Sequence, residues 1–235
     1  MHITPDSIIL FQLGPVSLNA TILFTWCIMA LMTVGSWLVT RKLSSTTRLS
    51  RWQNLLEVLV TGIRDEIREI SGQDPGRYLS FVGTLFLFIA VSNLLSIIPG
   101  YTPPTGSLST TTALAVCVFI AVPIYGITQK GLAYFKQYAK PSLLMLPFNI
   151  IGEVSRTIAL AMRLFGNIMS GTIIAAILLS IAPLIFPVIM QAFGLLIGLI
   201  QAYIFAILAM VYIAAGSRVR QNKIDASLQN KKGEV

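Results

Sequence analysis

The amino-acid sequence predicts an all-α integral membrane protein. Its mean hydropathy is +0.78, 55% of its residues are apolar, and the 11% that are charged are under half the share usual in soluble domains. Residues 7–40 and 78–129 carry no charge, and residues 157–217 carry only one. Each stretch is long enough for one or two membrane-crossing helices of about 20 residues. These observations predict a single membrane domain over residues 1–235.

Five transmembrane helices fit the three stretches, because prolines divide the longer two. The prolines in residues 99–104 and 183–187 are expected to form turns between spans. The predicted spans are 18–40, 79–98, 111–129, 155–182 and 188–217.

The distribution of lysines and arginines predicts the orientation, since basic residues near span ends are retained on the cytoplasmic side. Of the 17, seven fall in 41–77, three in 128–143 and five after Gly216, whereas 1–17, 99–110 and 183–187 have none. With five spans, this places the N-terminal segment 1–17 outside the cell and the tail 218–235 in the cytoplasm. The net charge of +8 is therefore a signal of topology, and nucleic-acid binding is not expected.

Between the first two spans, residues 50–70 predict an amphipathic helix. Apolar residues recur at helical spacing from Trp52 to Ile70, and charged residues lie between them. A helix of this kind lies along the cytoplasmic surface of the membrane or docks on another subunit's membrane stalk. The sequence leaves both arrangements open.

The last two spans are longer than a bilayer requires. A continuous helix from Val188 to Ser217 measures about 45 Å against a hydrocarbon core of about 30 Å, so it has to tilt strongly. The preceding span is equally long if it begins near Phe148. We expect the two to form a long tilted hairpin that presents one extended face to a partner. Small residues and amides recur on the last span at intervals that favour close packing, namely Gln191, Gly194, Gly198 and Gln201, and Phe205 falls at the next position of the same stripe.

Arg163 is the single charge within residues 157–217. An arginine in the middle of a bilayer costs between about 2.5 and 17 kcal/mol, so it normally faces a partner or water. The only acidic residue between Asp74 and Asp225 is Glu153, about 15 Å away along a helix. We therefore expect the counter-charge of Arg163 to come from another protein. Polar residues on the same side of the helix can line a wet path, namely Asn167, Ser170, Arg156, Ser155 and Glu153.

Two further interpretations follow from single residues. For Asn167 and Gln201, a purely structural role as amides that tie helices together stays open. Cys27 and Cys117 lie within apolar spans, where thiols behave as small hydrophobic groups, and His2 is the only histidine. We expect no metal site and no cofactor.

The run Arg163–Asn167, which reads Arg-Leu-Phe-Gly-Asn, is preceded by Leu146–Ile150 and followed by Gln201–Phe205. In this order the three runs resemble subunit a of rotary F-type ATP synthases. Further matching runs are Asn93–Gly100 and Thr110–Leu114, so the resemblance extends from about residue 50 to about residue 216. The five-span topology with a cytoplasmic C-terminus also agrees with that family.

The resemblance implies a non-catalytic stator in the F0 membrane sector, while the ATP chemistry belongs to the separate F1 sector. The implied partners are a rotating ring of c subunits, the b-subunit peripheral stalk, the whole F1F0 complex and the lipid of a bacterial inner membrane. In that family, the arginine matching Arg163 attracts the deprotonated carboxylate of each c subunit and prevents ions from short-circuiting between two half-channels. The half-channel candidates are Asn149, Glu153, Ser155, Arg156, Ser170, Thr172, Gln191 and Ser107, with Asn167 and Gln201 beside Arg163 and with Gly194 and Gly198 expected to pack on the c ring.

The chain departs from the family's pattern at the outer half-channel. Many members have an acidic residue nine positions after the arginine and a histidine seven before the glutamine, where this chain has Thr172 and Gly194. An aspartate often found before the third span is also missing from Thr105–Ser109. Without these titratable groups, both H⁺ and Na⁺ remain open as the coupling ion, and a sodium-translocating ATPase variant is the alternative.

Two other classes of function compete. A stand-alone transporter or channel, with Arg163 as an anion site, predicts matched halves and gating glycines, and the sequence shows no such halves. A structural anchor without transport predicts that replacement of Arg163 leaves coupled ion movement intact.

Overall fold

The computed structural model describes residues 9–13, 16–41, 51–98, 101–131, 145–181 and 186–217. Within them, five helices are long and apolar enough to cross a membrane, as predicted. The predicted tail 218–235 and most of the segment 1–17 lie outside the described residues. The elements in chain order are β1 (Ile9–Leu13), β2 (Val16–Asn19), α1 (Ala20–Thr40), α2 (Arg51–Ser71), α3 (Gly76–Leu94), the short 3-10 helices η2 (Leu95–Ile97) and η3 (Pro104–Gly106), α4 (Leu108–Lys130), α6 (Met145–Ile181) and α7 (Phe186–Ser217).

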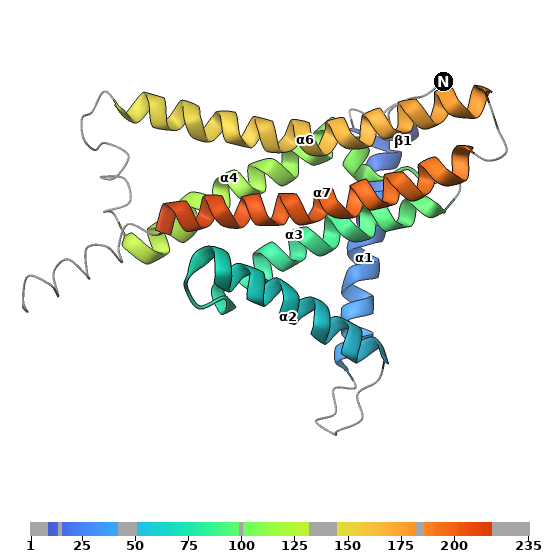
Figure 1. Ribbon diagram of the computed structural model, residues 1–235. Coiled ribbons are helices and arrows are strands. Elements are labelled where there is room, and N and C mark those ends of the chain that lie inside the picture. Colours follow the sequence, from blue (N-terminus) through green and yellow to red (C-terminus); the bar gives the residue numbers. More distant parts are fainter. Residues whose placement is uncertain are drawn as a thin grey trace, which may run out of the picture.

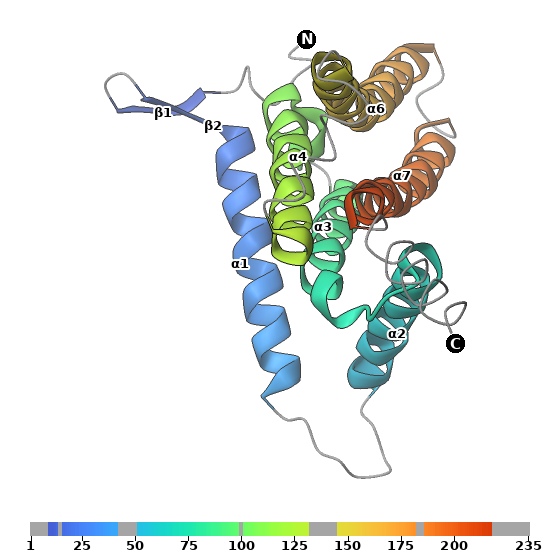
Figure 2. The ribbon, with the colours of Figure 1, turned by 90° about the vertical axis from the view of Figure 1, so that its left-hand side faces the viewer.

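Four transmembrane helices, α3, α4, α6 and α7, pack on one another, and α1 crosses them at one side (Figure 1 and Figure 2). α6 and α7 run antiparallel and side by side, and α1 runs across both of them (Figure 1). In the view turned by 90°, α3 and α4 lie between α1 and the α6–α7 pair (Figure 2). At 1.5 Å per residue, the 37 residues of α6 measure about 55 Å and the 32 residues of α7 about 48 Å. This arrangement confirms the long hairpin of the last two spans.

Local sequence explains where several helices begin and end. Gly72 ends α2 and Gly131 ends α4, both with positive φ (65° and 60°), a conformation that glycine adopts without steric strain. Their N–H groups donate to the carbonyls of Arg68 (2.9 Å) and Ile127 (2.7 Å). At the start of α3, the Asp74 carboxylate accepts a hydrogen bond from the Gly76 N–H at 3.3 Å. These short caps fix the C-terminal ends of α2 and α4 and the start of α3.

The structure differs from the prediction at the starts of the spanning helices and in the N-terminal segment. β1 and β2 pair antiparallel and precede α1, which therefore begins at residue 20 rather than 18. α3 and α4 each begin three residues earlier than expected, at 76 and 108. α6 begins at 145 rather than 155, because Pro147 fits the first turn of a helix and the charges of Glu153 and Arg156 pair with each other.

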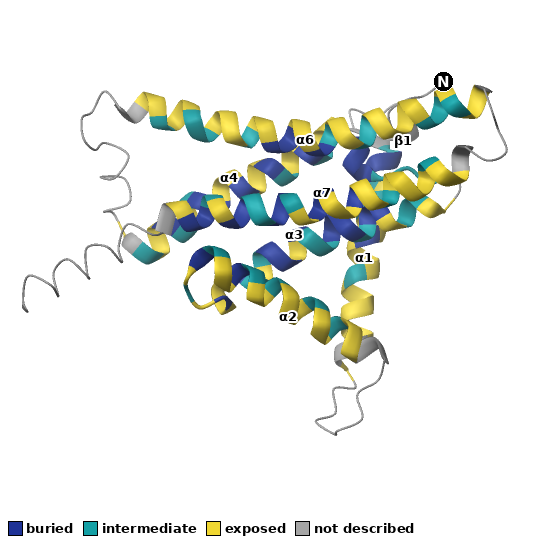
Figure 3. Cartoon of the chain, in the orientation of Figure 1, coloured by how far each residue is buried: buried dark blue, intermediate teal, exposed yellow. Residues whose placement is uncertain are grey.

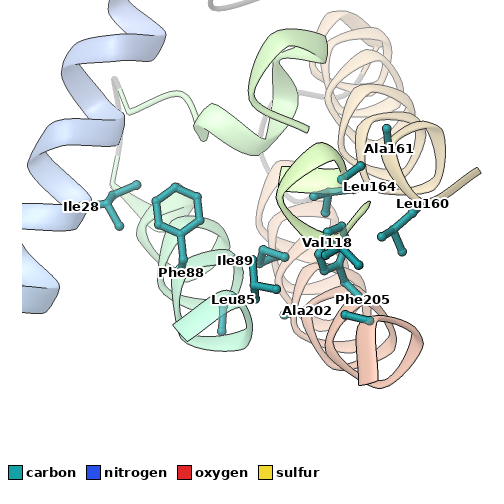
Figure 4. Packing of buried hydrophobic residues seen from close by; sticks show 13 residues of the cluster. Ile28, Leu85, Phe88, Ile89, Val118, Leu160, Ala161, Leu164, Ala202 and Phe205 are labelled. Carbon is teal, nitrogen blue, oxygen red and sulfur yellow. The ribbon is translucent and has the colours of Figure 1, made fainter. Parts of the chain in front are cut away.

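A buried apolar cluster contains residues of all five spanning helices. Figure 4 shows Ile28 of α1 beside Phe88 of α3, with Leu164 of α6 and Phe205 of α7 in the same cluster. Ile28 is 1% exposed, and Leu164 and Phe205 are fully buried. The cluster fixes the middle of α6, which carries Arg163, against α4 and α7.

The amphipathic helix α2 docks on this chain itself. Ile67 is 1% exposed and packs with Tyr78 of α3 and with Met210 and Ile213 of α7. The N-terminal half of α2 remains open, and Leu55 and Val58 are 50% and 63% exposed there. α2 is therefore neither free on the membrane surface nor wholly available to another subunit, because its C-terminal half is part of the core.

α6 is poorly covered by the rest of the chain. In an apolar stretch of 18 consecutive residues of α6, 6% of the residues are buried, against 39% for a stretch of the same length in α7. Exposed residues run along nearly the whole of α6 (Figure 3). Lipid or another protein chain must therefore cover this helix.

Candidate functional site

Arg163 lies at the midpoint of α6, and its side chain is exposed. Across the described ranges, it makes no hydrogen bond and no salt bridge. The ion pair in those ranges joins Arg156 to Glu153 instead, at 3.0 Å. Its exposed neighbours on α6 are both apolar and polar: Ile158 and Met162 are 57% and 51% exposed, and Asn167 and Ser170 are exposed as well. The guanidinium thus stands on an exposed surface of α6 without a counter-charge from the described residues.

One turn further along α6, Asn167 meets Gln201 of α7. The Asn167 Nδ2 atom donates a hydrogen bond to Gln201 Oε1 at 2.7 Å. Gln201 is 1% exposed, and its Nε2 atom is buried without a partner among the described residues. Leaving such a donor unpaired costs about 1–3 kcal/mol. Stability alone therefore does not explain a glutamine at this position.

The N-terminal half of α6 carries the paired charges. Glu153 accepts a hydrogen bond from Arg156, whose side chain is 52% exposed and lies 5.7 Å from the centre of the Tyr212 ring of α7. Arg156 faces Tyr212 and Asn167 faces Gln201, which gives a consistent antiparallel register for the two helices. Glu153 is thereby occupied with Arg156 and does not neutralise Arg163.

A second polar region lies where α3, η3 and α7 meet. Asn93 donates from Nδ2 to the Gly198 carbonyl at 2.9 Å and accepts at Oδ1 from the Thr105 hydroxyl at 2.8 Å. The Ser92 and Thr102 hydroxyls are buried without a partner among the described residues. The Tyr101 phenol donates to the Ser92 carbonyl at 3.1 Å, and burial raises the pKa of Tyr101 to about 12. The region is built from amides and hydroxyls rather than from carboxylates.

The remaining predicted side chains fall near these two regions or along α6. Gln191 donates from Nε2 to the Ser96 carbonyl at 2.9 Å, and Ser107 is fully buried with its hydroxyl 2.7 Å from that of Ser109. Ser170 and Thr172 are exposed, and their hydroxyls donate to the carbonyls of Asn167 and Met169 on α6 itself. Ser155 is exposed and Asn149 is half-buried. The structure thus brings Gln191 and Ser107 to the α3 end, whereas Ser155, Ser170 and Thr172 face away from the core.

The structure corrects the expected role of Gly198. This residue is buried, and a Cβ atom added to it would lie 2.9 Å from the Cβ of Asn93. Gly198 therefore packs on α3 of this chain, which leaves no room for it to pack on a c ring. Gly194 is exposed and would have nothing within 4 Å of an added Cβ, so its packing role stays a prediction. The small-residue stripe of α7 turns inward from Gly198 onward, because Gln201 and Phe205 are also buried.

Two pairs were missed by reasoning from the sequence. One is Asn93 with Thr105, for which the only signal was an amide within an apolar span. The other is Tyr203 of α7, whose hydroxyl donates to Glu66 of α2 at 3.0 Å. A carboxylate on the polar face of a surface helix gave no hint of a partner inside a span.

Comparison with known proteins agrees with this arrangement. The family described as ATP synthase A chain matches residues 22–214. ATP synthase subunit a 2 of Acaryochloris marina is 66% identical over 223 residues, which cover 94% of this chain and 95% of the relative. ATP synthase subunit a of Albidiferax ferrireducens is 60% identical, covering 95% of this chain and 97% of the relative.

A third relative, ATP synthase subunit a 1 of Chlorobaculum parvum, is 58% identical over 94% of this chain and 98% of its own length. The match covers all five spanning helices and both polar regions. This chain therefore belongs to the ATP synthase A chain family, as a multi-pass membrane protein and a non-catalytic F0 subunit of the complex.

Proposed function

We propose that this subunit is the stator that couples the passage of H⁺ or Na⁺ to rotation of a c ring, with Arg163 facing the ring's carboxylates. The observation that carries the proposal is the state of Arg163. It is exposed at the midpoint of a helix longer than the bilayer is thick, and it has no counter-charge among the described residues. A guanidinium in hydrocarbon needs an anion or water, so the partner is a mobile carboxylate of another subunit.

The proposed coupling follows from electrostatics. A carboxylate opposite Arg163 is favoured in its ionised form, because the opposite charge stabilises it. A carboxylate that faces lipid is favoured in its neutral, ion-loaded form, because desolvation penalises the charge. Each carboxylate therefore unloads as it approaches Arg163 and reloads after passing it. Arg163 also repels cations, which prevents direct flow from one side of the membrane to the other.

Polar groups on either side of Arg163 support two separate access paths. Toward the N-terminal end of α6 lie Asn149, Glu153, Ser155 and Arg156, which we assign to the cytoplasmic half-channel. Toward its C-terminal end lie Asn167, Ser170 and Thr172, which with Gln191, Gln201 and Ser107 we assign to the outer one. The outer set contains no titratable carboxylate, so ions there pass along waters held by amides and hydroxyls.

The remaining partners and the location are part of the same proposal. The c ring covers the exposed side of α6, and the b-subunit peripheral stalk holds this subunit against rotation. The membrane is a bacterial inner membrane, with the N-terminus outside and the C-terminus in the cytoplasm. The basic residues of 41–77 and of the C-terminal tail support this orientation.

The test replaces Arg163 in the intact complex. Arg163→Ala is expected to lower ion-driven ATP synthesis in inverted vesicles by about 100-fold or more, because removing one member of a buried charge pair costs about 3–5 kcal/mol. Met162→Ala, which alters the exposed neighbour, serves as the control and is expected to stay near the parental rate. Synthesis near the parental rate in Arg163→Ala, with normal amounts of assembled complex, contradicts the proposal.

The same vesicles identify the coupling ion. ATP-driven acidification in sodium-free buffer that a protonophore abolishes indicates H⁺. ATP-driven uptake of ²²Na⁺ that resists the protonophore indicates the sodium-translocating variant. Neither result changes the role assigned to Arg163, because either ion neutralises the same carboxylate.

A further inference from the structure

Asn93 is a buried amide at the end of α3, and it holds two other elements at once. Its side chain is 4% exposed. Nδ2 donates to the carbonyl of Gly198 in α7, and Oδ1 accepts from the hydroxyl of Thr105 in η3. Because a carbonyl can only accept, the amide nitrogen has to face Gly198, and the orientation of the amide is thereby fixed. Both ends of the amide are used.

The contact with Gly198 depends on the absence of a side chain there. A Cβ atom on Gly198 would lie 2.9 Å from Asn93 Cβ, a distance that real Cβ atoms essentially never show, and 3.0 Å from Nδ2. Glycine thus allows α3 and α7 to approach until the amide reaches a backbone carbonyl in the interior of a helix. Two residues 105 positions apart form a single clamp.

The clamp lies next to both members of the Asn167–Gln201 pair. On α7, Gln201 follows Gly198 by three residues, about 4.5 Å along the helix axis. On α6, Ile168 directly follows Asn167, and its Cγ2 atom lies 3.2 Å from where a Cβ of Gly106 in η3 would be. η3 is the segment that Thr105 ties to Asn93. Because η3 contacts α6 at Ile168, the clamp determines the distance between Asn167 on α6 and Gln201 on α7.

We infer that Asn93 is a positioning residue for the ion-translocation site. It sets the separation and rotation of Asn167 and Gln201, one turn from Arg163, without touching the ion or the c ring. The role requires a group that donates to Gly198 and accepts from Thr105 at the same time. Asparagine does both without charge, an ionised aspartate can only accept, and a leucine can do neither. This inference rests on the proposed role of Arg163.

The test uses Asn93→Leu and Asn93→Asp in the complete complex, with ATP-driven ion pumping measured per assembled complex between pH 6 and pH 9. The Asn93→Leu complex loses these interhelical hydrogen bonds, and it is expected to pump about 3-fold to 15-fold more slowly than the parent at every pH. Asn93→Asp is expected to pump better than Asn93→Leu at pH 6, where a buried carboxyl group is protonated and can donate to Gly198. Its advantage is expected to shrink as pH rises and the carboxyl group ionises.

Other titratable groups near the clamp do not produce this pH dependence. Tyr101 donates to Ser92 beside Asn93, but burial raises the pKa of Tyr101 to about 12, outside the range tested. Arg163 lies on α6, one turn from Asn167, and is present in both variants. Cys27 of α1, which interacts with Tyr101, is present in both variants. Asn93→Leu therefore controls for each of them.

Three results overturn the inference. The first is Asn93→Leu pumping within twofold of the parent. The second is equal loss in Asn93→Leu and Asn93→Asp at every pH, because the donor to Gly198 is then irrelevant. The third is a loss explained entirely by less assembled complex, which makes the clamp a folding element only. Arg163→Ala measured in parallel separates the two levels: retained coupling there refutes the proposed function, whereas its loss beside a normal Asn93→Leu refutes only the clamp.

Discussion

Gln201→Leu separates the functional from the structural value of the buried glutamine. The change removes the hydrogen bond to Asn167, and interhelical hydrogen bonds in membranes are worth about 0.6 kcal/mol on average and about 1.7 kcal/mol at most. It also removes the unpaired Nε2 donor, which relieves about 1–3 kcal/mol. The two terms nearly cancel, so stability is expected to stay within about 1.5 kcal/mol of the parent or to rise. Leucine fills nearly the same volume in a position that is 1% exposed.

Function is expected to respond differently. Without its partner, Asn167 is no longer held beside Arg163, and ion pumping per complex should fall about 3-fold to 15-fold if the whole bond energy is used for positioning. Stability is measured as the temperature at which this subunit is released from the purified complex, and pumping is measured in vesicles. Tyr203→Phe is the control, since it also loses one interhelical hydrogen bond but is 46% exposed and lies outside both proposed half-channels. A drop in stability above about 2 kcal/mol, or unchanged pumping, refutes the reasoning.

Two further predictions concern packing. Gly198→Ala should destabilise the subunit by about 1–3 kcal/mol in the thermal-release measurement, because the added Cβ meets Asn93. Gly194→Ala has open space around the added Cβ, so its stability should be unchanged or rise by up to about 1 kcal/mol. Equal effects of the two changes would contradict the contact between Gly198 and Asn93. Ile67→Ala should release α2 and speed trypsin cleavage after Arg64 and Arg68, which are exposed but held in a docked helix, since loss of a large buried apolar side chain costs about 2–5 kcal/mol. Tyr203→Phe, which loses one hydrogen bond at a residue 46% exposed, should leave cleavage nearly unchanged. Faster cleavage in Tyr203→Phe than in Ile67→Ala would show that the hydrogen bond holds the helix.

Charge patterning was enough to predict the five spans, because in a chain of this composition a long stretch without charges is stable within the lipid bilayer and not in water. The same signal misplaced the start of α6 by ten residues, since Glu153 and Arg156 read as the edge of the membrane. In the structure the two side chains pair, which lets the helix continue through them. Composition cannot reveal such a pair without knowledge of the fold. The β1–β2 hairpin was missed because residues 1–17 were predicted only as an external segment, with no secondary structure assigned to them.

At the site, single residues were predicted better than their partners. The lack of a nearby carboxylate in the sequence singled out Arg163, and the described residues likewise give it no counter-charge. The sequence was sufficient here because the spans carry so few charges that every possible partner can be checked. Asn93 and Gly198 lie 105 positions apart, and helical periodicity gives no information on which helix meets which. The stripe containing Gly198 was therefore assigned to the wrong neighbour, since a small-residue face packs equally well on a helix of its own chain.

The inclination of α6 determines how the groups along it are spread. A helix about 55 Å long within a layer about 30 Å thick advances through the layer by about 0.8 Å per residue and sideways by about 1.3 Å. Ser155 and Ser170 are thus separated by about 12 Å in depth but by nearly 20 Å in lateral position. A neighbour that slides past this helix meets its polar groups in succession rather than together. The inclination of the helix sets the order in which they are met.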